Sequence, residues 1–241
     1  MALIQMNFHS QVLDKGTNVN IILPENRDND KLQVLYLLHG HSGDYSNWVR
    51  FSNIEKYVSG KQVMVIMPSA YNVYYTDAKN WVKSFSFLTK ELPAIMNKTF
   101  NLNVPRERTY IAGLSMGGYG ALKALFTYPE SYGKAASFSG ALDVKSMRKR
   151  LSPDRIVLID TIFGDKIEPE NDLFELTKSF NHQADIYISC GTEDFLFQDN
   201  QKFVNHLNDL KIKHTYITRP GTHNWEFWDE EVKTVIEFFK I

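Results

Sequence analysis

The sequence predicts an α/β fold with a mostly parallel central sheet of about eight strands and helices on both faces. Short apolar runs alternate with helical patterns along all 241 residues, which implies crossover connections between parallel strands. Two runs, Val34–Leu38 and Val63–Met67, are almost continuously apolar, as expected for strands covered on both faces. Because no repeat or linker divides the chain, we expect one domain over residues 1–241.

The remaining elements follow from the same patterns. Ala2–Phe8 and Asn18–Leu23 alternate apolar and polar residues, which predicts an antiparallel pair at one edge of the sheet. Further strands are expected at Arg108–Ala112, Ala135–Phe138, Asp185–Cys190 and His214–Thr218, and helices at Asn47–Ser59, Trp81–Phe100, Met116–Tyr128, Asp199–Leu210 and Asp229–Lys240. Residues 141–182 are charged, lack a clear strand and are long for a connection. We expect there a solvated helical excursion or a small lid-like insertion.

Composition and charge exclude several classes of function. The chain has 27 basic and 28 acidic residues, a net charge of −1, so nothing favours nucleic acid or an anionic membrane. One cysteine cannot form an internal disulfide or a thiolate metal site, and no spacing of His, Asp and Glu suggests a metal. The N-terminus lacks the features of a signal peptide, and no apolar stretch approaches the ~18 residues of a membrane span. We therefore expect a cytoplasmic protein without cofactor or metal.

A serine lies where the strand Arg108–Ala112 is expected to turn into the helix Met116–Tyr128. The segment reads Gly113-Leu114-Ser115-Met116-Gly117, a G-x-S-x-G pattern. On such a tight turn the serine backbone is strained and the hydroxyl points out above the sheet, while the glycines let strand and helix approach closely. In this context the pattern predicts that Ser115 is a nucleophile rather than part of a structural turn.

A serine nucleophile needs a base within reach, and the base needs an acid that orients it. His223 lies in the loop before the last helix, at the carboxyl edge of the sheet, where open α/β sheets build their sites. Asp194 follows a strand at the same edge and is the expected acid, with Glu193 and Asp143 as rivals and a helix N-cap as its alternative role. The order Ser115, Asp194, His223 is that of the α/β-hydrolases. The histidines at less suitable places are His9, His182, His206 and His214.

The loop after the strand Val34–Leu38 is expected to supply part of the oxyanion hole. Acyl transfer needs N–H donors aimed at the oxygen on which negative charge develops. We assign one donor to the backbone N–H of Met116 and the other, by position, to the backbone N–H of His41. The neighbouring His39 is expected to bond nearby backbone and hold the loop.

Several aromatic residues lie near these positions in the sequence, and they belong either to the wall of the pocket or to the core. Tyr71, Tyr74, Tyr75, Trp225 and Trp228 are candidates for the pocket wall, although such residues are as often packed in the core. The run Phe195, Leu196 and Phe197 is expected in the core, and Cys190 is expected to be a small buried hydrophobe rather than a nucleophile.

With these motifs, the chain resembles a known family. It is similar to the esterase D / S-formylglutathione hydrolase-like branch of the α/β-hydrolases, and most to small tributyrin esterases (EstA-type) of Gram-positive bacteria. The resemblance covers nearly the whole chain. The segments that match the family are Tyr36–Gly40 with Ser42–Asp44, Glu91–Pro93, Ala112–Gly120, Phe163-Gly164, Cys190–Leu196 and Gly221–Trp225.

The resemblance implies an α/β-hydrolase fold and a metal-free serine carboxylesterase that acts through an acyl-enzyme. Carried over to this sequence, it implies Ser115 as nucleophile, Asp194 as acid, His223 as base, and the N–H groups of His41 and Met116 as oxyanion donors. The expected partner is a small-molecule ester with a short acyl chain, acetyl to butyryl. The formylglutathione branch carries a cysteine in the loop that here reads His41-Ser42-Gly43-Asp44, which disfavours a glutathione thioester.

The sequence leaves three alternative functions open. One is a carbohydrate-ester hydrolase for acetyl or feruloyl groups, and a second is an S-formylglutathione hydrolase. The third is an inactive α/β-hydrolase that serves as a binding protein, because fold does not dictate function. The physiological ester and the oligomeric state, including a homo-oligomer, are not decided by the sequence.

Overall fold

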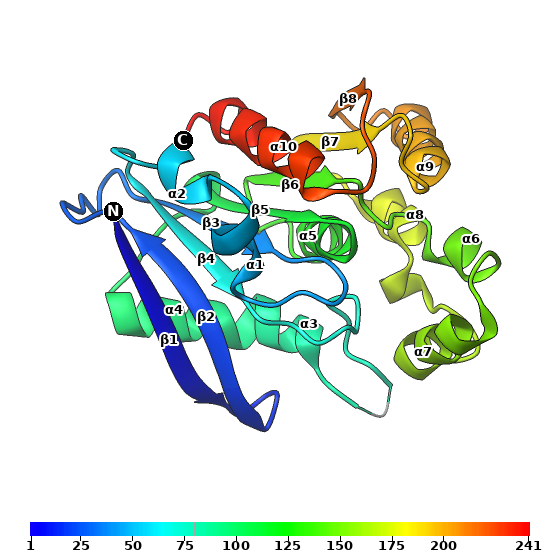
Figure 1. Cartoon of the computed structure of the whole chain (residues 1–241), viewed down its shortest axis with the longest axis horizontal. Helices are drawn as coiled ribbons and strands as arrows, with labels where there is room; N and C mark the ends of the chain where they lie inside the picture. Colours follow the sequence, from blue (N-terminus) through cyan, green and yellow to red (C-terminus); the bar gives the residue numbers. More distant parts are fainter. Residues whose placement is uncertain (80) are drawn as a thin grey trace.

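One mixed sheet forms the centre of the molecule (Figure 1). The structure, a computed structural model, describes residues 1–79 and 81–241. The described residues form eight strands in the order β1-β2-β4-β3-β5-β6-β7-β8. Their bounds are β1 (Ala2–Ser10), β2 (Lys15–Leu23), β3 (Gln33–Leu38), β4 (Val63–Pro68), β5 (Thr109–Leu114), β6 (Lys134–Phe138), β7 (Asp185–Gly191) and β8 (Thr215–Arg219). Strands β1 and β2 are antiparallel and the rest pair in parallel with one another, which confirms the predicted fold class.

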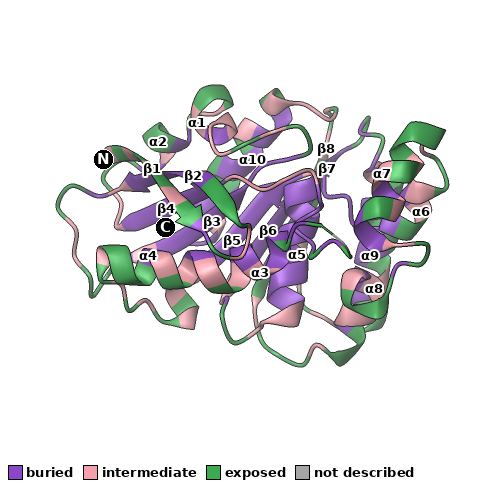
Figure 2. Cartoon of the chain, turned by 90° about the horizontal axis from the view of Figure 1, so that it is seen from below, coloured by how far each residue is buried: buried purple, intermediate pink, exposed green. Residues whose placement is uncertain are grey.

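Helices cover both faces of the sheet. One face packs against α1 (Asn47–Phe51), α2 (Ile54–Tyr57) and α10 (Trp225–Phe238), and the other against α4 (Leu92–Phe100), α5 (Met116–Thr127) and α9 (Phe197–Asp209). Figure 2 shows the buried strands and α5 at the centre, with the exposed surfaces of the outer helices around them. The core is therefore two apolar layers separated by the sheet.

The register of the parallel strands aligns their carboxyl ends. Leu38 of β3 pairs with Gly113 of β5, and Leu114 of β5 pairs with Phe138 of β6. On the other side, Gly191 of β7 pairs with Arg219 of β8. The loops that follow β3, β5, β7 and β8 consequently leave the sheet at one edge, and these are the loops that carry the predicted site residues.

Two expected helices are interrupted in the structure. The expected helix Asn47–Ser59 is split into α1 and α2, because Asn53 bonds Asp229 of α10 through its backbone N–H and its side chain, both at 2.7 Å. The expected helix Trp81–Phe100 begins as α3 (Ser84–Ser86), widens to a π turn, η1 (Phe87–Glu91), and continues as α4. Pro93 explains the π turn, since it has no N–H for the carbonyl four residues earlier.

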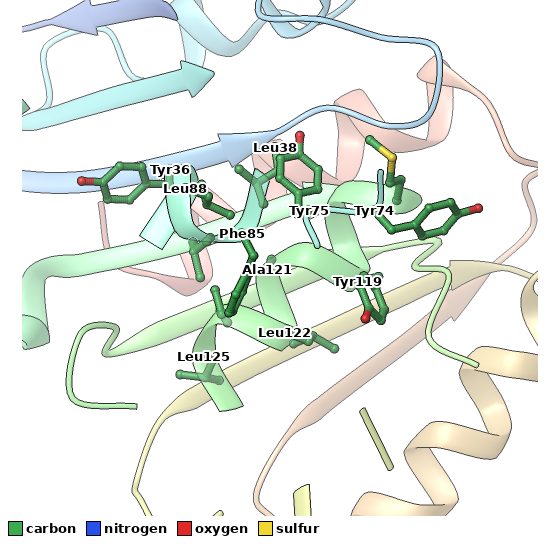
Figure 3. Close-up of a cluster of buried hydrophobic side chains, with 14 of the residues drawn as sticks. Tyr36, Leu38, Tyr74, Tyr75, Phe85, Leu88, Tyr119, Ala121, Leu122 and Leu125 are labelled. Atoms are coloured by element: carbon green, nitrogen blue, oxygen red, sulfur yellow. The ribbon is translucent and has the colours of Figure 1, made fainter. Parts of the chain in front are cut away.

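An apolar cluster joins α5 to the loop after β4 and to α3 with η1. Figure 3 shows Tyr119, Leu122 and Leu125 of α5 in one cluster with Phe85 and Leu88. A lysine is buried here: the Nζ of Lys123 donates to Thr76 Oγ1 at 2.9 Å and to Asn171 Oδ1 at 2.6 Å. Burial lowers the pKa of Lys123 to about 7.

Residues 141–182, here called the insertion, stand between β6 and β7. They form α6 (Val144–Arg148), α7 (Pro153–Phe163), η3 (Pro169–Asn171), α8 (Leu173–Leu176) and η4 (Thr177–Ser179); a further short turn, η2 (Arg106–Arg108), precedes β5. In Figure 1, α6 and α7 lie at the right, beyond the helices that cover the sheet. The hydroxyl of Tyr119 donates to the carbonyl of Asn171 at 2.7 Å, and Lys123 bonds the side chain of the same residue, so α5 holds the insertion at η3.

Candidate active site

Ser115 occupies the sharp turn between β5 and α5. Its backbone has φ 53° and ψ −116°, a region that residues other than glycine rarely adopt and that costs about 1–3 kcal/mol. The turn is held because the N–H of Ser115 donates to the carbonyl of Phe138 at 2.8 Å, and the N–H of Ala141 donates to the carbonyl of Ser115 at 3.1 Å. A β-carbon on Gly117 would lie 2.6 Å from the carbonyl oxygens of Leu38 and His39, so glycine is required where α5 meets the end of β3.

Ser115, His223 and Asp194 form a hydrogen-bonded chain. His223 Nδ1 lies 2.7 Å from Asp194 Oδ2, and its Nε2 lies 2.9 Å from the Oγ of Ser115. Because the carboxylate only accepts, Nδ1 carries the proton and Nε2 is free to accept from the serine hydroxyl. The Asp194 side chain is fully buried, that of His223 is 19% exposed and Ser115 is half-buried, so the serine and the histidine are open to the cavity while the aspartate is not.

The two carboxylate oxygens of Asp194 have different partners. Oδ2 faces His223, while Oδ1 accepts from the backbone N–H of Leu196 at 2.8 Å, just before α9. This backbone contact fixes the orientation of the carboxylate that bonds the imidazole. The N-cap of α9 is Leu196, and no side chain caps that helix, so the alternative role of Asp194 as a helix N-cap is wrong. The two rival acids lie elsewhere: Asp143 caps α6 at Ser146 and pairs with Lys202.

The second rival, Glu193, holds the loop that carries His223. Its Oε2 accepts from the N–H of Gly221 at 2.5 Å, and its own N–H donates to the carbonyl of Gly221 at 3.1 Å. The N–H of Gly221 and, secondly, the hydroxyl of Thr192 donate to the carboxylate and lower the pKa of Glu193. This supporting role was not recognised from the sequence, although the carboxylate next to Asp194 was a visible signal.

The loop after β3 faces the serine. His39 is buried: its Nε2 accepts from the N–H of Ala70 at 2.9 Å and its Nδ1 donates to the carbonyl of Gly40 at 2.7 Å, which confirms that it bonds nearby backbone. The ring is neutral because its Nε2 accepts a hydrogen bond, and burial lowers its pKa. Within residues 1–79 and 81–241, the backbone N–H groups of His41 and Met116 have no intramolecular acceptor, so both can donate to a ligand.

A cavity of about 580 Å³ opens over Ser115 and His223. Its sheet side comes from the loops after β3, β5, β7 and β8, and its far side comes from the insertion. The insertion contributes Ala141, Met147, Arg150, Leu151, Arg155, Leu158 and Ile159. The wall is thus mainly apolar, with arginine as its charged component.

The aromatic predictions have mixed outcomes. Tyr74, Trp225 and Trp228 line the cavity, whereas Tyr75 is packed in the core. The prediction that Phe195 lies in the core is wrong: it is 67% exposed, with its ring centroid 4.6 Å from that of His223. The same prediction is confirmed for its neighbour Leu196, which is 1% exposed.

The other aromatic, cysteine and histidine residues singled out in the sequence lie outside the catalytic group. Phe197 is half-buried at the start of α9, and Tyr71 lies near Trp81 outside the cavity wall. Cys190 is fully buried, as predicted, and burial raises the pKa of its thiol. His206 bonds Thr177 and Phe174, and His214 bonds the carbonyl of Ile212, while His9 and His182 lie outside the cavity wall.

The described part of the chain has neither a metal-binding cluster nor a membrane-spanning helix. No group of three or more His, Cys, Asp or Glu side chains there is arranged to hold a metal ion. No helix among the same residues is long and apolar enough to cross a bilayer.

Comparison with known proteins agrees with this geometry. The profile of the Esterase family matches residues 10–237. An acetyl esterase of Caldicellulosiruptor saccharolyticus is 30% identical over 99% of this chain and 98% of its own length. Two solved structures from Staphylococcus aureus, the fluorophosphonate-binding serine hydrolase FphF and the S-formylglutathione hydrolase FrmB, are each 28% identical, cover 99% of this chain and 98% of their own, and have TM-scores of 0.90 and 0.87.

The fold and the comparisons together define an α/β-hydrolase that hydrolyses carboxylic esters. The chain belongs to the Esterase family, within the group of serine esterases that includes S-formylglutathione hydrolases.

Proposed function

We propose that the protein is a serine carboxylesterase for small-molecule esters with short acyl chains, acetyl to butyryl, of the tributyrin-esterase type. The observation that carries the proposal is the hydrogen-bonded chain Ser115–His223–Asp194 on the floor of the cavity. We assign Ser115 as nucleophile, His223 as general base and acid, and Asp194 as the group that orients His223.

Acylation follows from these positions. The Oγ of Ser115 attacks the ester carbonyl while its proton passes to His223 Nε2, 2.9 Å away. Asp194 stabilises the resulting imidazolium through the bond to Nδ1. The N–H groups of His41 and Met116 receive the oxyanion, because both are free and flank the serine in the loop after β3 and at the start of α5. The intermediate then collapses, the alcohol leaves with the proton from His223, and the acyl group stays on Ser115.

Deacylation repeats the sequence with water. His223 takes a proton from a water molecule, and the hydroxyl attacks the acyl carbonyl. The oxyanion returns to the same two N–H donors, the bond to Oγ breaks, and the proton on His223 restores the serine hydroxyl. The products are the carboxylic acid and the free enzyme.

The apolar side of the cavity supports the binding of an acyl chain. Met147, Leu151, Leu158 and Ile159 bring apolar surface from the insertion to the site of Ser115, and each buried methylene contributes about 0.8 kcal/mol. We propose that the insertion acts as a cap that limits the length of the acyl chain. The acetyl esterase that is 30% identical is consistent with a short chain.

A series of p-nitrophenyl esters from acetate to octanoate, together with the ferulate, tests the proposal. Wild type should show its highest kcat/KM between acetate and butyrate, and Ser115→Ala should lose the activity. A maximum with octanoate would contradict the short acyl pocket, and a maximum with ferulate would reassign the enzyme to aromatic acyl groups.

A thioester is the second candidate substrate, because a structure 28% identical to this chain is an S-formylglutathione hydrolase. The loop His41–Asp44 has no cysteine, which favours the oxygen ester. Comparing kcat/KM for S-formylglutathione with that for p-nitrophenyl acetate decides between them, and a value at least a hundredfold higher for the thioester would replace the first proposal.

A further inference from the structure

Three arginines of the insertion lie on or near the cavity, and two of them are neutralised. Arg148 donates to both carboxylate oxygens of Asp160, at 2.6 and 2.8 Å. Arg150, which lines the cavity, pairs with Asp199 at the start of α9. Arg155 in the first turn of α7 also lines the cavity, and no hydrogen bond or ion pair holds its guanidinium among residues 1–79 and 81–241.

The described wall of the cavity has no carboxylate that could balance this charge. Among the described residues of its wall there is no aspartate and no glutamate. The nearest carboxylate in the sequence, Asp154, is exposed and does not line the cavity. Asp194 lies beneath His223, is fully buried, and has both oxygens occupied by hydrogen bonds. A ligand above Ser115 therefore meets a net positive wall.

The charge of Arg155 reaches the substrate side of the site. The pKa of His41 is lowered by burial and, secondly, by Arg155. Burial raises the pKa of Tyr74 to about 12, and Arg155 opposes that rise. His41, Tyr74 and the exposed Arg155 all line the cavity, so part of the field of the guanidinium falls inside it.

We propose that Arg155 is a specificity-determining residue that binds a carboxylate on the part of the ester away from the reacting carbonyl. An ester with an anionic end should then be preferred over a neutral ester of the same size and shape. A guanidinium suits this task because it offers two parallel N–H donors to the two oxygens of a carboxylate. The inference rests on the proposed ester hydrolysis and adds the chemical class of its substrate.

Matched pairs of substrates, a carboxylate and the isosteric carboxamide, isolate the charge. Mono-p-nitrophenyl adipate and the p-nitrophenyl ester of its monoamide carry the group on the acyl side. 4-Acetoxybenzoate and 4-acetoxybenzamide carry it on the alcohol side. The measured quantity is the ratio of kcat/KM for carboxylate over carboxamide within each pair, corrected for the spontaneous hydrolysis of each ester, and the pair with the larger ratio tells on which side of the ester bond the anion lies.

Three variants complete the experiment. In Arg155→Gln the ratio of the preferred pair should fall about tenfold, and Arg155→Lys should keep part of the preference because the charge stays while the two-donor geometry is lost. Lys149→Gln removes the same charge from an exposed position of the insertion outside the cavity wall, so its ratio should equal that of wild type. Added salt should reduce the ratio in wild type more than in Arg155→Gln.

The outcomes separate this inference from the proposed function. Equal ratios in wild type and Arg155→Gln for both pairs, with the carboxamides hydrolysed by both proteins, would overturn the role of Arg155 alone. If wild type hydrolyses neither carboxamide and Ser115 fails to react with a fluorophosphonate, the proposed esterase function fails instead. Near-ultraviolet circular dichroism of Arg155→Gln confirms that its tertiary structure is intact.

Discussion

The buried ammonium of Lys123 predicts an unusual dependence of stability on pH. Lys123 is 2% exposed, lies under Phe85 with Nζ 4.3 Å from the ring centroid, and bonds only neutral oxygens of Thr76 and Asn171. Burial lowers its pKa from 10.5 to about 7. Between these two values the unfolded chain holds a proton that the folded chain has released, so the free energy of unfolding rises with pH across this range.

The magnitude follows from the linkage relation. Each full pH unit contributes about 1.4 kcal/mol, and because the folded group is still half protonated at its pKa, the rise from about pH 7 to about pH 9 is about 2 kcal/mol. Urea unfolding of wild type and Lys123→Met at both pH values isolates this contribution as the difference between the two proteins. That difference should shift in favour of wild type by about 2 kcal/mol at the higher pH.

The control is Lys98→Met, which removes an exposed lysine of α4. Its difference from wild type should be the same at both pH values, because that ammonium is hydrated in the folded and the unfolded chain. If the difference between wild type and Lys123→Met is also independent of pH, Lys123 stays protonated inside the fold and the reasoning from burial is refuted.

Three further substitutions test individual contacts of the site. Asp194→Asn should lower kcat by about 10³–10⁴ while changing stability by less than about 1 kcal/mol, because an asparagine oxygen still accepts from the N–H of Leu196 but the amide no longer fixes the His223 tautomer. Asp194→Ala should lose both activity and stability, and equal stability of the two variants would contradict a stabilising role of the bond to Leu196. Gly117→Ala should destabilise by at least about 2 kcal/mol in urea unfolding, since its β-carbon meets two backbone oxygens at 2.6 Å, whereas Gly16→Ala, with no atom within 4 Å, serves as its control. Glu193→Ala should reduce kcat by about tenfold to a hundredfold with little change in KM, since it frees the Gly221 loop that positions His223, and an unchanged kcat would show that the loop is held without it.

The strands were predictable because each has a short local pattern, either an apolar run or an alternation of apolar and polar residues. All eight expected strands are present, and the antiparallel edge pair is where the alternation placed it. The carboxyl-edge rule then brings Ser115, Asp194 and His223 to one side of the sheet without any knowledge of side-chain contacts. This part of the site depends on topology alone.

What the sequence could not supply depends on partners far along the chain. The break between α1 and α2 is held by Asp229, 176 residues after Asn53, and no local pattern announces that contact. The exposure of Phe195 has a similar origin, because only the tertiary fold shows that His223 supplies its neighbour. Among the arginines of the insertion, the pairing of Arg150 with Asp199 decides which charge is left to face the cavity.

The measurement that tests the central claim most directly is covalent labelling of the nucleophile. Wild type is incubated with a fluorophosphonate, and intact-mass and peptide analysis locate the adduct. One phosphonyl group should attach, on Ser115, with parallel loss of ester hydrolysis, and Ser115→Ala should not react. Ser42→Ala, which alters an exposed serine of the same cavity, should be labelled like wild type. A label on another residue, or full hydrolysis by Ser115→Ala, would contradict the assignment of the catalytic serine.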